Sequence, residues 1–215
     1  MLLRKAFFLL IVRPFLKVVV GVRYIGRDRV PPDDPILVVA NHNSHLDAVV
    51  LSNVFPLSRL PRVKPVAAQD YFDRGFKAWF AARIMNVLPI LRRGFTDENH
   101  PLKLMGDALD AGTTLILFPE GSRGEPEVMQ PFKSGVARLL EGRPSLRVVP
   151  CYLRGLGRAL PRGDSIPMPI NVEAIIGEPR TYAGTAEEML ARIEADVRAL
   201  GGLTASAARA DSEAP

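Results

Sequence analysis

Residues 36–47 read ILVVANHNSHLD, and this stretch decides the predicted fold. Its first part, Ile36–Ala40, is an unbroken apolar and mostly β-branched run, which is typical of a strand covered on both faces of a sheet. A polar turn follows, and from Leu46 to Val54 the apolar residues return with helical spacing. A buried strand, a loop and a helix in this order predict one unit of an α/β fold.

The same alternation continues on both sides of this unit. Further apolar runs predict strands at Val22–Ile25, Val66–Ala68, Val87–Leu91, Thr114–Phe118, Arg147–Leu153 and Asn171–Ile176. Helical spacing predicts further helices at Phe72–Met85, Leu102–Ala111, Ser134–Glu141 and Ala186–Leu200. Together these elements predict a single α/β domain over residues 22–202, with a largely parallel or mixed sheet flanked by helices.

Two local features refine this prediction. Pro150 stands inside an apolar strand, where its missing N–H requires a sheet edge or a bulge. Gly201 and Gly202 are expected to end the last helix. Residues 203–215 are small and polar, so we expect them to form a disordered tail.

Composition restricts the class of the protein before any motif is considered. The chain has 215 residues, of which 47% are apolar, and this is enough to bury one core. The single cysteine, Cys151, leaves no internal disulfide and no cysteine-built zinc site. The net charge of +5 suggests an anionic partner, which charge alone leaves open among nucleic acid, a membrane and a phosphorylated small molecule. Residues 1–93 carry a net +9 and the remainder −4, so the positive charge is concentrated in the first half.

The N-terminal residues 1–21 are apolar and basic, but their longest uncharged apolar run, Ala6–Val12, has only seven residues. A helix needs about 20 apolar residues to cross a bilayer. We therefore predict a membrane-interfacial helix that is peripheral or monotopic, with flanking Arg and Lys side chains reaching the headgroups. The alternative is a helix packed on the protein's own core. The side chains expected at the acyl boundary are Phe7, Phe8, Leu10, Ile11, Phe15 and Leu16.

The turn after Ile36–Ala40 holds the first candidate catalytic residues. If the helix begins near Ser44, Asp47 lies in its first turn, within reach of the His42 imidazole. A carboxylate there fixes the imidazole tautomer and leaves the other ring nitrogen free to take a proton from a hydroxyl. Two alternatives stay open. Asp47 is only a charge at the helix start, or His42 and His45 bind a metal with Asp47, as in a metal-dependent hydrolase.

Two further predicted strands end in residues suited to an anion. Thr114–Phe118 is followed by a loop with two glycines, a serine and Arg123, whose guanidinium and nearby backbone N–H groups suit a phosphate. Val87–Leu91 is followed by Arg92 and Arg93, which point to opposite sides, so only one is expected to reach a shared cleft. Ligands of open α/β sheets gather beyond the carboxyl ends of the strands. The alternatives are a plain turn and a solvated strand end.

Taken in order, these segments resemble the glycerolipid acyltransferase family, whose best-known members are 1-acylglycerol-3-phosphate acyltransferases. NHNSHLD contains the family's H-x4-D block as His42 and Asp47, and VLPILRRG resembles its apolar strand ending in arginine. Val148–Pro150 resembles its fourth block. The glycine that often opens the second block is absent, so either Arg92 or Arg93 is the phosphate-binding arginine, with a slight preference for Arg93. The third block, FPEGSR, is present unaltered as Phe118, Pro119, Glu120, Gly121, Ser122 and Arg123.

The resemblance implies a function as well as a fold. His42, oriented by Asp47, would deprotonate the free hydroxyl of lysophosphatidic acid while that oxygen attacks acyl-CoA or acyl-carrier protein. The product would be phosphatidic acid, in phospholipid biosynthesis. Arg92 or Arg93, with the FPEGSR loop, would hold the acceptor's phosphate. The resemblance implies no metal and no redox cofactor, membrane lipids but no nucleic acid as partners, and a place at the cytoplasmic face of a membrane.

Two other functions remain alternatives. Acceptor choice is not encoded in the four blocks, so another lyso-lipid, such as a lysophospholipid or a lyso-ornithine lipid, is the first. A non-catalytic, basic membrane-binding protein is the second.

Overall fold

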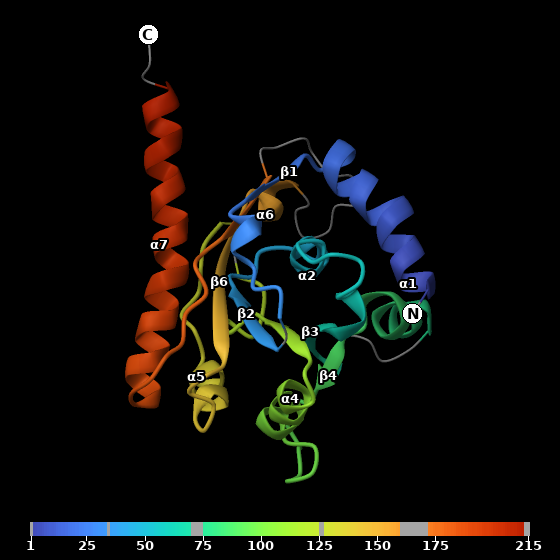
Figure 1. The fold of residues 1–215 in the computed structure, drawn as a ribbon, viewed down its shortest axis with the longest axis vertical. Coiled ribbons are helices and arrows are strands. Elements are labelled where there is room, and N and C mark those ends of the chain that lie inside the picture. The colour runs from blue at the N-terminus through green and yellow to red at the C-terminus, as the bar shows by residue number, and fades with distance from the viewer. Residues whose placement is uncertain (1, 34, 70–74, 125–126, 160–171, 213–215) are drawn as a thin grey trace.

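A seven-stranded sheet forms the centre of the structure, which is a computed structural model (Figure 1). The structure describes the chain except for residues 1, 34, 70–74, 125–126, 160–171 and 213–215. The strands lie in the order β1-β7-β6-β2-β5-β3-β4, and every pair is parallel except β6 with β7. The largely parallel, mixed sheet is therefore confirmed. The strands are β1 (Val22–Ile25), β2 (Ile36–Ala40), β3 (Val63–Ala68), β4 (Leu88–Ile90), β5 (Thr114–Leu117), β6 (Arg147–Arg154) and β7 (Val172–Ile176).

Helices cover both faces of this sheet, as Figure 1 shows. Along β2, Ile36 and Val38 belong to the core cluster on one face, and Leu37 and Val39 belong to the cluster on the other. This double burial is why the strands are continuous apolar runs in the sequence. One face carries the N-terminal helix and α2 (Asp47–Ser52). The other carries α4 (Pro101–Asp110), α5 (Gly135–Leu140) and α7 (Ala186–Ser212).

The remaining helical segments are short. They are α3 (Gly75–Phe80) with the π-helical η6 (Ala81–Met85), α6 (Leu156–Ala159), and the 3-10 turns η3 (Arg27–Arg29) and η4 (Leu60–Arg62).

The predicted end of the last helix is wrong. α7 continues through Gly201 and Gly202 to Ser212, so the two glycines do not end it. Glycine lowers helix propensity by about 1 kcal/mol without forbidding a helix, and the alanine-rich sequence that follows favours one. Residues 213–215 lie outside the described residues.

Pro150 occupies a bulge-like position inside the sheet. Its strand β6 is central, between β7 and β2, so an edge location is excluded. On the β7 side, however, Val148 pairs with Arg180 and Cys151 pairs with Ile176. Three residues of the β7 side therefore oppose two of β6 at this point, and the ladder shifts where proline supplies no N–H.

The N-terminal helix packs one narrow stripe against the domain. It consists of α1 (Leu2–Phe7) followed by two π-helical segments, η1 (Phe8–Val12) and η2 (Phe15–Val19). A four-residue spacing drifts around an α-helix of 3.6 residues per turn, and the wider π turns reduce that drift. The stripe therefore keeps facing the core. Its buried residues recur every fourth position, at Arg4, Phe8, Val12, Leu16 and Val20.

The opposite side of this helix is apolar and exposed. Phe8 and Leu16, which we expected at a membrane, lie in the protein core instead, because they fall on the buried stripe. Leu10 and Ile11 are 70% and 54% exposed, in keeping with the expectation for those two. Within the described residues, no helix is both long and apolar enough to span a membrane. The other exposed apolar residues of the helix are Leu2, Leu3, Leu9, Val18 and Val19.

Arg4 fastens the start of this helix to the domain. We expected its guanidinium to reach lipid headgroups, but the residue is 2% exposed. It donates hydrogen bonds to the carbonyls of Leu60, Val63 (3.2 Å) and Met85 (3.1 Å). Burial lowers the pKa of Arg4 to about 10. The buried charge is stabilised by three carbonyl dipoles of the domain. Arg4 therefore anchors the helix to the domain and does not bind a lipid headgroup.

Replacing Arg4 is therefore expected to destabilise the protein. Arg4→Met keeps the apolar stem but removes the guanidinium that donates to three carbonyl groups, so the free energy of unfolding should fall by about 2–4 kcal/mol. Urea denaturation followed by circular dichroism measures this loss. Lys5→Met removes the same charge from a half-buried neighbour and should cost well under half as much. Equal losses in the two variants would contradict the anchoring role.

Candidate active site

The candidate site lies at the carboxyl ends of parallel strands. β2, β5, β3 and β4 pair in parallel, so the loops that follow β2, β5 and β4 meet at one edge of the sheet. These loops carry His42, Glu120 and Arg92 respectively. Their meeting there follows from the topology, as the sequence predicted.

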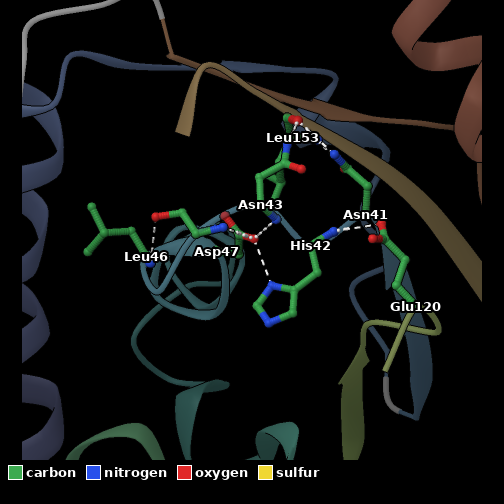
Figure 2. A network of polar contacts seen from close by, with 8 residues as sticks. Asn41, His42, Asn43, Leu46, Asp47, Glu120 and Leu153 are labelled. Atoms are coloured by element: carbon green, nitrogen blue, oxygen red, sulfur yellow. Dashed lines mark hydrogen bonds and ion pairs between the residues drawn. The ribbon is translucent and has the colours of Figure 1, made fainter. Parts of the chain in front are cut away.

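Two buried asparagines fix the loop after β2. The Asn41 side chain donates to the Leu153 carbonyl (2.9 Å) and accepts from the Leu153 N–H (2.7 Å). The Asn43 side chain donates to the same carbonyl (3.1 Å). Both contacts join the loop to β6, and Figure 2 shows His42 between them, with its ring on the opposite side of the loop. Sequence reasoning missed this role of the two asparagines, although both belong to the quoted motif.

The His42 imidazole and the Asp47 carboxylate form a hydrogen-bonded pair. Nδ1 of His42 lies 2.8 Å from Oδ2 of Asp47 (Figure 2). The same oxygen accepts the N–H groups of Asn43 (2.6 Å) and Ser44 (2.8 Å). Asp47 is fully buried, whereas the His42 side chain is 22% exposed. The carboxylate is thus fixed, and it directs Nε2 of the imidazole, the nitrogen that it does not contact, away from itself.

Phe118 and Glu120 hold His42 from the side of β5. The Phe118 ring stacks on the imidazole, with the ring centroids 4.3 Å apart and the planes at 20°. Oε1 of Glu120 accepts the backbone N–H of His42 (2.9 Å). Glu120 is 3% exposed, and burial raises the pKa of its carboxyl, although the N–H groups of His42 and Gln130 oppose the shift. Glu120 therefore positions the loop that follows β2.

Arg92 and Lys133 converge on Gly121. Nη2 of Arg92 donates to the Gly121 carbonyl (3.0 Å). Gly121 has φ +75°, and a Cβ at this position would lie 2.6 Å from Nζ of Lys133. The left-handed backbone favours glycine, and the absence of a side chain lets the amine approach. Two cationic groups therefore meet beside the FPEGSR loop, and sequence reasoning missed Lys133. The signal available was the Pro-Phe-Lys segment just before α5.

The other predicted residues are distributed around these contacts. Pro119 is buried, and its carbonyl accepts the N–H of Lys133 (3.0 Å). Ser122 is exposed and Arg123 half-buried on the same loop. Arg93 is exposed, and between it and His42, Asp47 or Glu120 no contact is found in the described part of the chain. The structure thus brings Arg92, and not the slightly preferred Arg93, to the loop.

His45, the third residue of the possible metal site, differs from Asp47 in its exposure. It is exposed, whereas Asp47 is fully buried. Among the residues that the structure describes, no group of three or more His, Cys, Asp or Glu side chains is arranged to hold a metal ion.

Comparison with known proteins agrees with this geometry. The sequence model of the family described as Acyltransferase matches residues 21–154, from the end of the N-terminal helix to the end of β6. The chain belongs to the acyltransferase family. The matched range contains every site residue discussed above.

Individual acyltransferases resemble the chain over most of its length. A chloroplastic 1-acyl-sn-glycerol-3-phosphate acyltransferase of Arabidopsis thaliana is 30% identical over 168 residues, which cover 77% of this chain and 44% of that protein. An N-acylphosphatidylethanolamine synthase of Arabidopsis thaliana is 30% identical over 165 residues, covering 69% and 57%. The chain therefore spans less than two thirds of either relative's length.

A solved acyltransferase has the same fold. The crystal structure of the 1-acyl-sn-glycerophosphate acyltransferase PlsC from Thermotoga maritima matches with a TM-score of 0.70. The match covers 86% of this chain and 72% of that one, at 23% sequence identity. It confirms the α/β architecture predicted from the sequence.

Proposed function

We propose that the protein transfers a fatty acyl group from acyl-CoA or acyl-carrier protein to the free hydroxyl of 1-acylglycerol-3-phosphate. The product is phosphatidic acid, which belongs to phospholipid biosynthesis. One observation carries the proposal: the buried Asp47 carboxylate holds Nδ1 of a partly exposed His42, beside the cationic groups of Arg92 and Lys133. Membership in the acyltransferase family supports the same reaction class.

The dyad suits a general-base mechanism. Nε2 of His42 takes the proton of the acceptor hydroxyl as that oxygen attacks the thioester carbon. The new C–O bond forms, the C–S bond breaks, and the imidazolium returns its proton to the leaving thiolate. Asp47 stabilises the imidazolium through Nδ1. The acyl group passes directly to the acceptor, and the proposal requires no metal or redox cofactor.

Arg92 and Lys133 suit the acceptor's phosphate. Both reach Gly121, on the loop that follows β5, and a guanidinium with an ammonium supplies several donors to one phosphate. A phosphate held there fixes the glycerol portion of the acceptor relative to His42, and this positioning accounts for much of the rate enhancement.

Removing either cation is expected to weaken acceptor binding. Lys133→Ala and Arg92→Ala should each raise KM for lysophosphatidic acid about 10- to 100-fold, as expected for the loss of a charge-assisted hydrogen bond. The value of kcat should change much less. Initial rates measured against acceptor concentration provide both constants. Arg93→Ala, the matched control on the same strand end, should raise KM less than about threefold. An effect of Arg93→Ala as large as that of Arg92→Ala would contradict the assignment.

The exposed apolar side of the N-terminal helix supports a membrane location. Leu2, Leu10 and Val18 are each at least 70% exposed, an expensive arrangement in water and a favourable one in an interface. We place this helix in the bilayer surface at the cytoplasmic face, where the lipid acceptor and the acyl donor are both available.

A second acceptor is favoured by one relative. The name of the N-acylphosphatidylethanolamine synthase implies an amine acceptor, and this protein has the same 30% identity to the chain as the 1-acyl-sn-glycerol-3-phosphate acyltransferase, over a smaller share of it. A labelled acyl donor with purified protein and parallel acceptors distinguishes the two. Labelled phosphatidic acid from lysophosphatidic acid supports the proposal. If the label appeared only in acylated phosphatidylethanolamine, or only in the products of lyso-lipids without a terminal phosphate, that acceptor would replace lysophosphatidic acid in the proposal.

A further inference from the structure

A cavity of about 580 Å³ lies away from the candidate active site. It is lined by Arg13 of the N-terminal helix, Arg27 of η3, and Ser58 and Arg59 from the segment after α2. Val and Pro side chains complete the lining. Asp47 begins α2 at the active site, whereas the lining residues Val54, Pro56, Ser58 and Arg59 follow the other end of this helix.

Arg13 and Arg27 donate only to neutral acceptors beside this cavity. Arg27 donates to the carbonyls of Val54 (2.9 Å) and Asn53 (2.9 Å), and Arg13 to Oδ1 of Asn53 (3.3 Å) and the carbonyl of Phe55 (3.5 Å). All these acceptors are neutral. Among the described residues no ion pair is found for either arginine, and Nη1 of both makes no hydrogen bond there. The two guanidiniums are therefore fixed in place with donors to spare.

Arg59 brings a third guanidinium to the same cavity. It donates to the carbonyls of Pro31 and Asp33 (3.3 Å) and lies over the Phe55 ring, 5.1 Å from its centroid. One cation is enough to cap the carbonyl end of a short helix such as α2. Arg13 and Arg27, whose acceptors are all neutral, line one cavity and repel one another, and this repulsion is relieved when an anion binds between them. Arginine forks match phosphate oxygens particularly well.

The cavity lies on the basic flank of the N-terminal helix. Lys5, Arg13 and Lys17 are spaced by eight and four residues, so they lie along one side of a helix whose buried stripe also repeats every fourth residue. Leu10 and Val18 lie on the side opposite the stripe. If that apolar side enters the bilayer, the basic flank and the cavity lie at the depth of the lipid phosphates.

We infer that this cavity binds the phosphate of an anionic phospholipid headgroup, by means of Arg13, Arg27 and Arg59, beside the membrane-inserted helix. The inference rests on the proposed membrane contact of the N-terminal helix, but not on the acyl transfer reaction. The site fixes one headgroup on the protein, and so sets the orientation of the domain on the bilayer.

A carboxylate introduced into the cavity tests this site without removing any arginine hydrogen bond. Ser58 is exposed in the lining, so Ser58→Glu places a negative charge among the three guanidiniums. The Ser58→Glu variant should bind phosphatidylcholine vesicles that contain phosphatidylglycerol about tenfold or more weakly than the unmodified protein, as measured in a sedimentation assay. Thr181→Glu adds the same charge at an exposed position between β7 and α7 and should stay within about twofold of the unmodified protein. Equal weakening by both substitutions would overturn the site and leave only general electrostatic attraction.

A charge-removal pair gives a second measurement. Arg27→Gln with Arg59→Gln should weaken vesicle binding more than Lys5→Gln with Lys17→Gln, which removes the same charge from the helix flank. Equal losses would again overturn the site, whereas no vesicle binding by the unmodified protein would refute the membrane contact itself.

Inorganic phosphate, added at constant ionic strength, shows whether the site accepts any phosphate or only that of a lipid headgroup. Release of the unmodified protein from vesicles supports a site for any phosphate, and retention supports a site specific for the lipid headgroup.

Discussion

His42→Ala is expected to lower kcat for acyl transfer about 10²–10⁴-fold, the contribution typical of a general base. The substitution removes the ring nitrogen that takes the proton of the acceptor hydroxyl. The fold should persist, because Asn41 and Asn43 hold the loop on β6 independently of the imidazole. Single-turnover rates with saturating acyl-CoA and lysophosphatidic acid measure the effect directly.

His45→Ala is the matched control for this experiment. His45 lies in the same motif and is exposed, so its loss should change the rate less than about threefold. A folded His42→Ala variant with undiminished rate would leave the protein as a non-catalytic, basic membrane-binding protein.

Asp47→Asn is expected to produce the second-largest loss of rate, about 10²–10⁴-fold in kcat. The amide has nearly the same shape, but it lacks the negative charge that stabilises the imidazolium in the transition state. Its one oxygen can take the place of Oδ2, which alone accepts the N–H groups of Asn43 and Ser44 and contacts the His42 ring, so the main change is the loss of charge. KM for the acceptor should change little, since Asp47 is fully buried and does not reach the substrate.

A stability measurement separates the two roles of Asp47. Because the carboxylate is buried and accepts two backbone N–H groups, Asp47→Ala should also lower the free energy of unfolding, by about 1–3 kcal/mol. Asp47→Asn should retain more of that stability than Asp47→Ala while losing comparable activity. If activity in the two variants followed stability alone, Asp47 would be only a structural residue at the start of α2.

Much of the fold was predictable because both faces of the sheet are buried. β2 is apolar at every position and β5 at every position after Thr114, and this leaves an unmistakable run in the sequence. Arg4 was not predictable in this way. Its acceptors lie 56, 59 and 81 residues away, and nothing in a local pattern distinguishes a buried arginine from one that reaches a headgroup.

In the candidate site, too, contacts between residues close in the sequence were predictable, and contacts between distant residues were not. His42 and Asp47 are five residues apart on one turn, so their contact follows from local geometry alone. Lys133 approaches Gly121 although it lies twelve positions further along the chain, and the choice between Arg92 and Arg93 depends on the exact register of β4 against β3. Contacts made across such distances require the tertiary structure.

Formation of phosphatidic acid tests the central claim most directly. Purified protein, a radiolabelled acyl-CoA or acyl-carrier protein, and lysophosphatidic acid are incubated with vesicles, and the lipid products are separated and counted. We predict labelled phosphatidic acid from the unmodified protein and, in the same time, almost none from His42→Ala. Folded, vesicle-bound protein that makes no labelled phosphatidic acid with either donor would contradict the account.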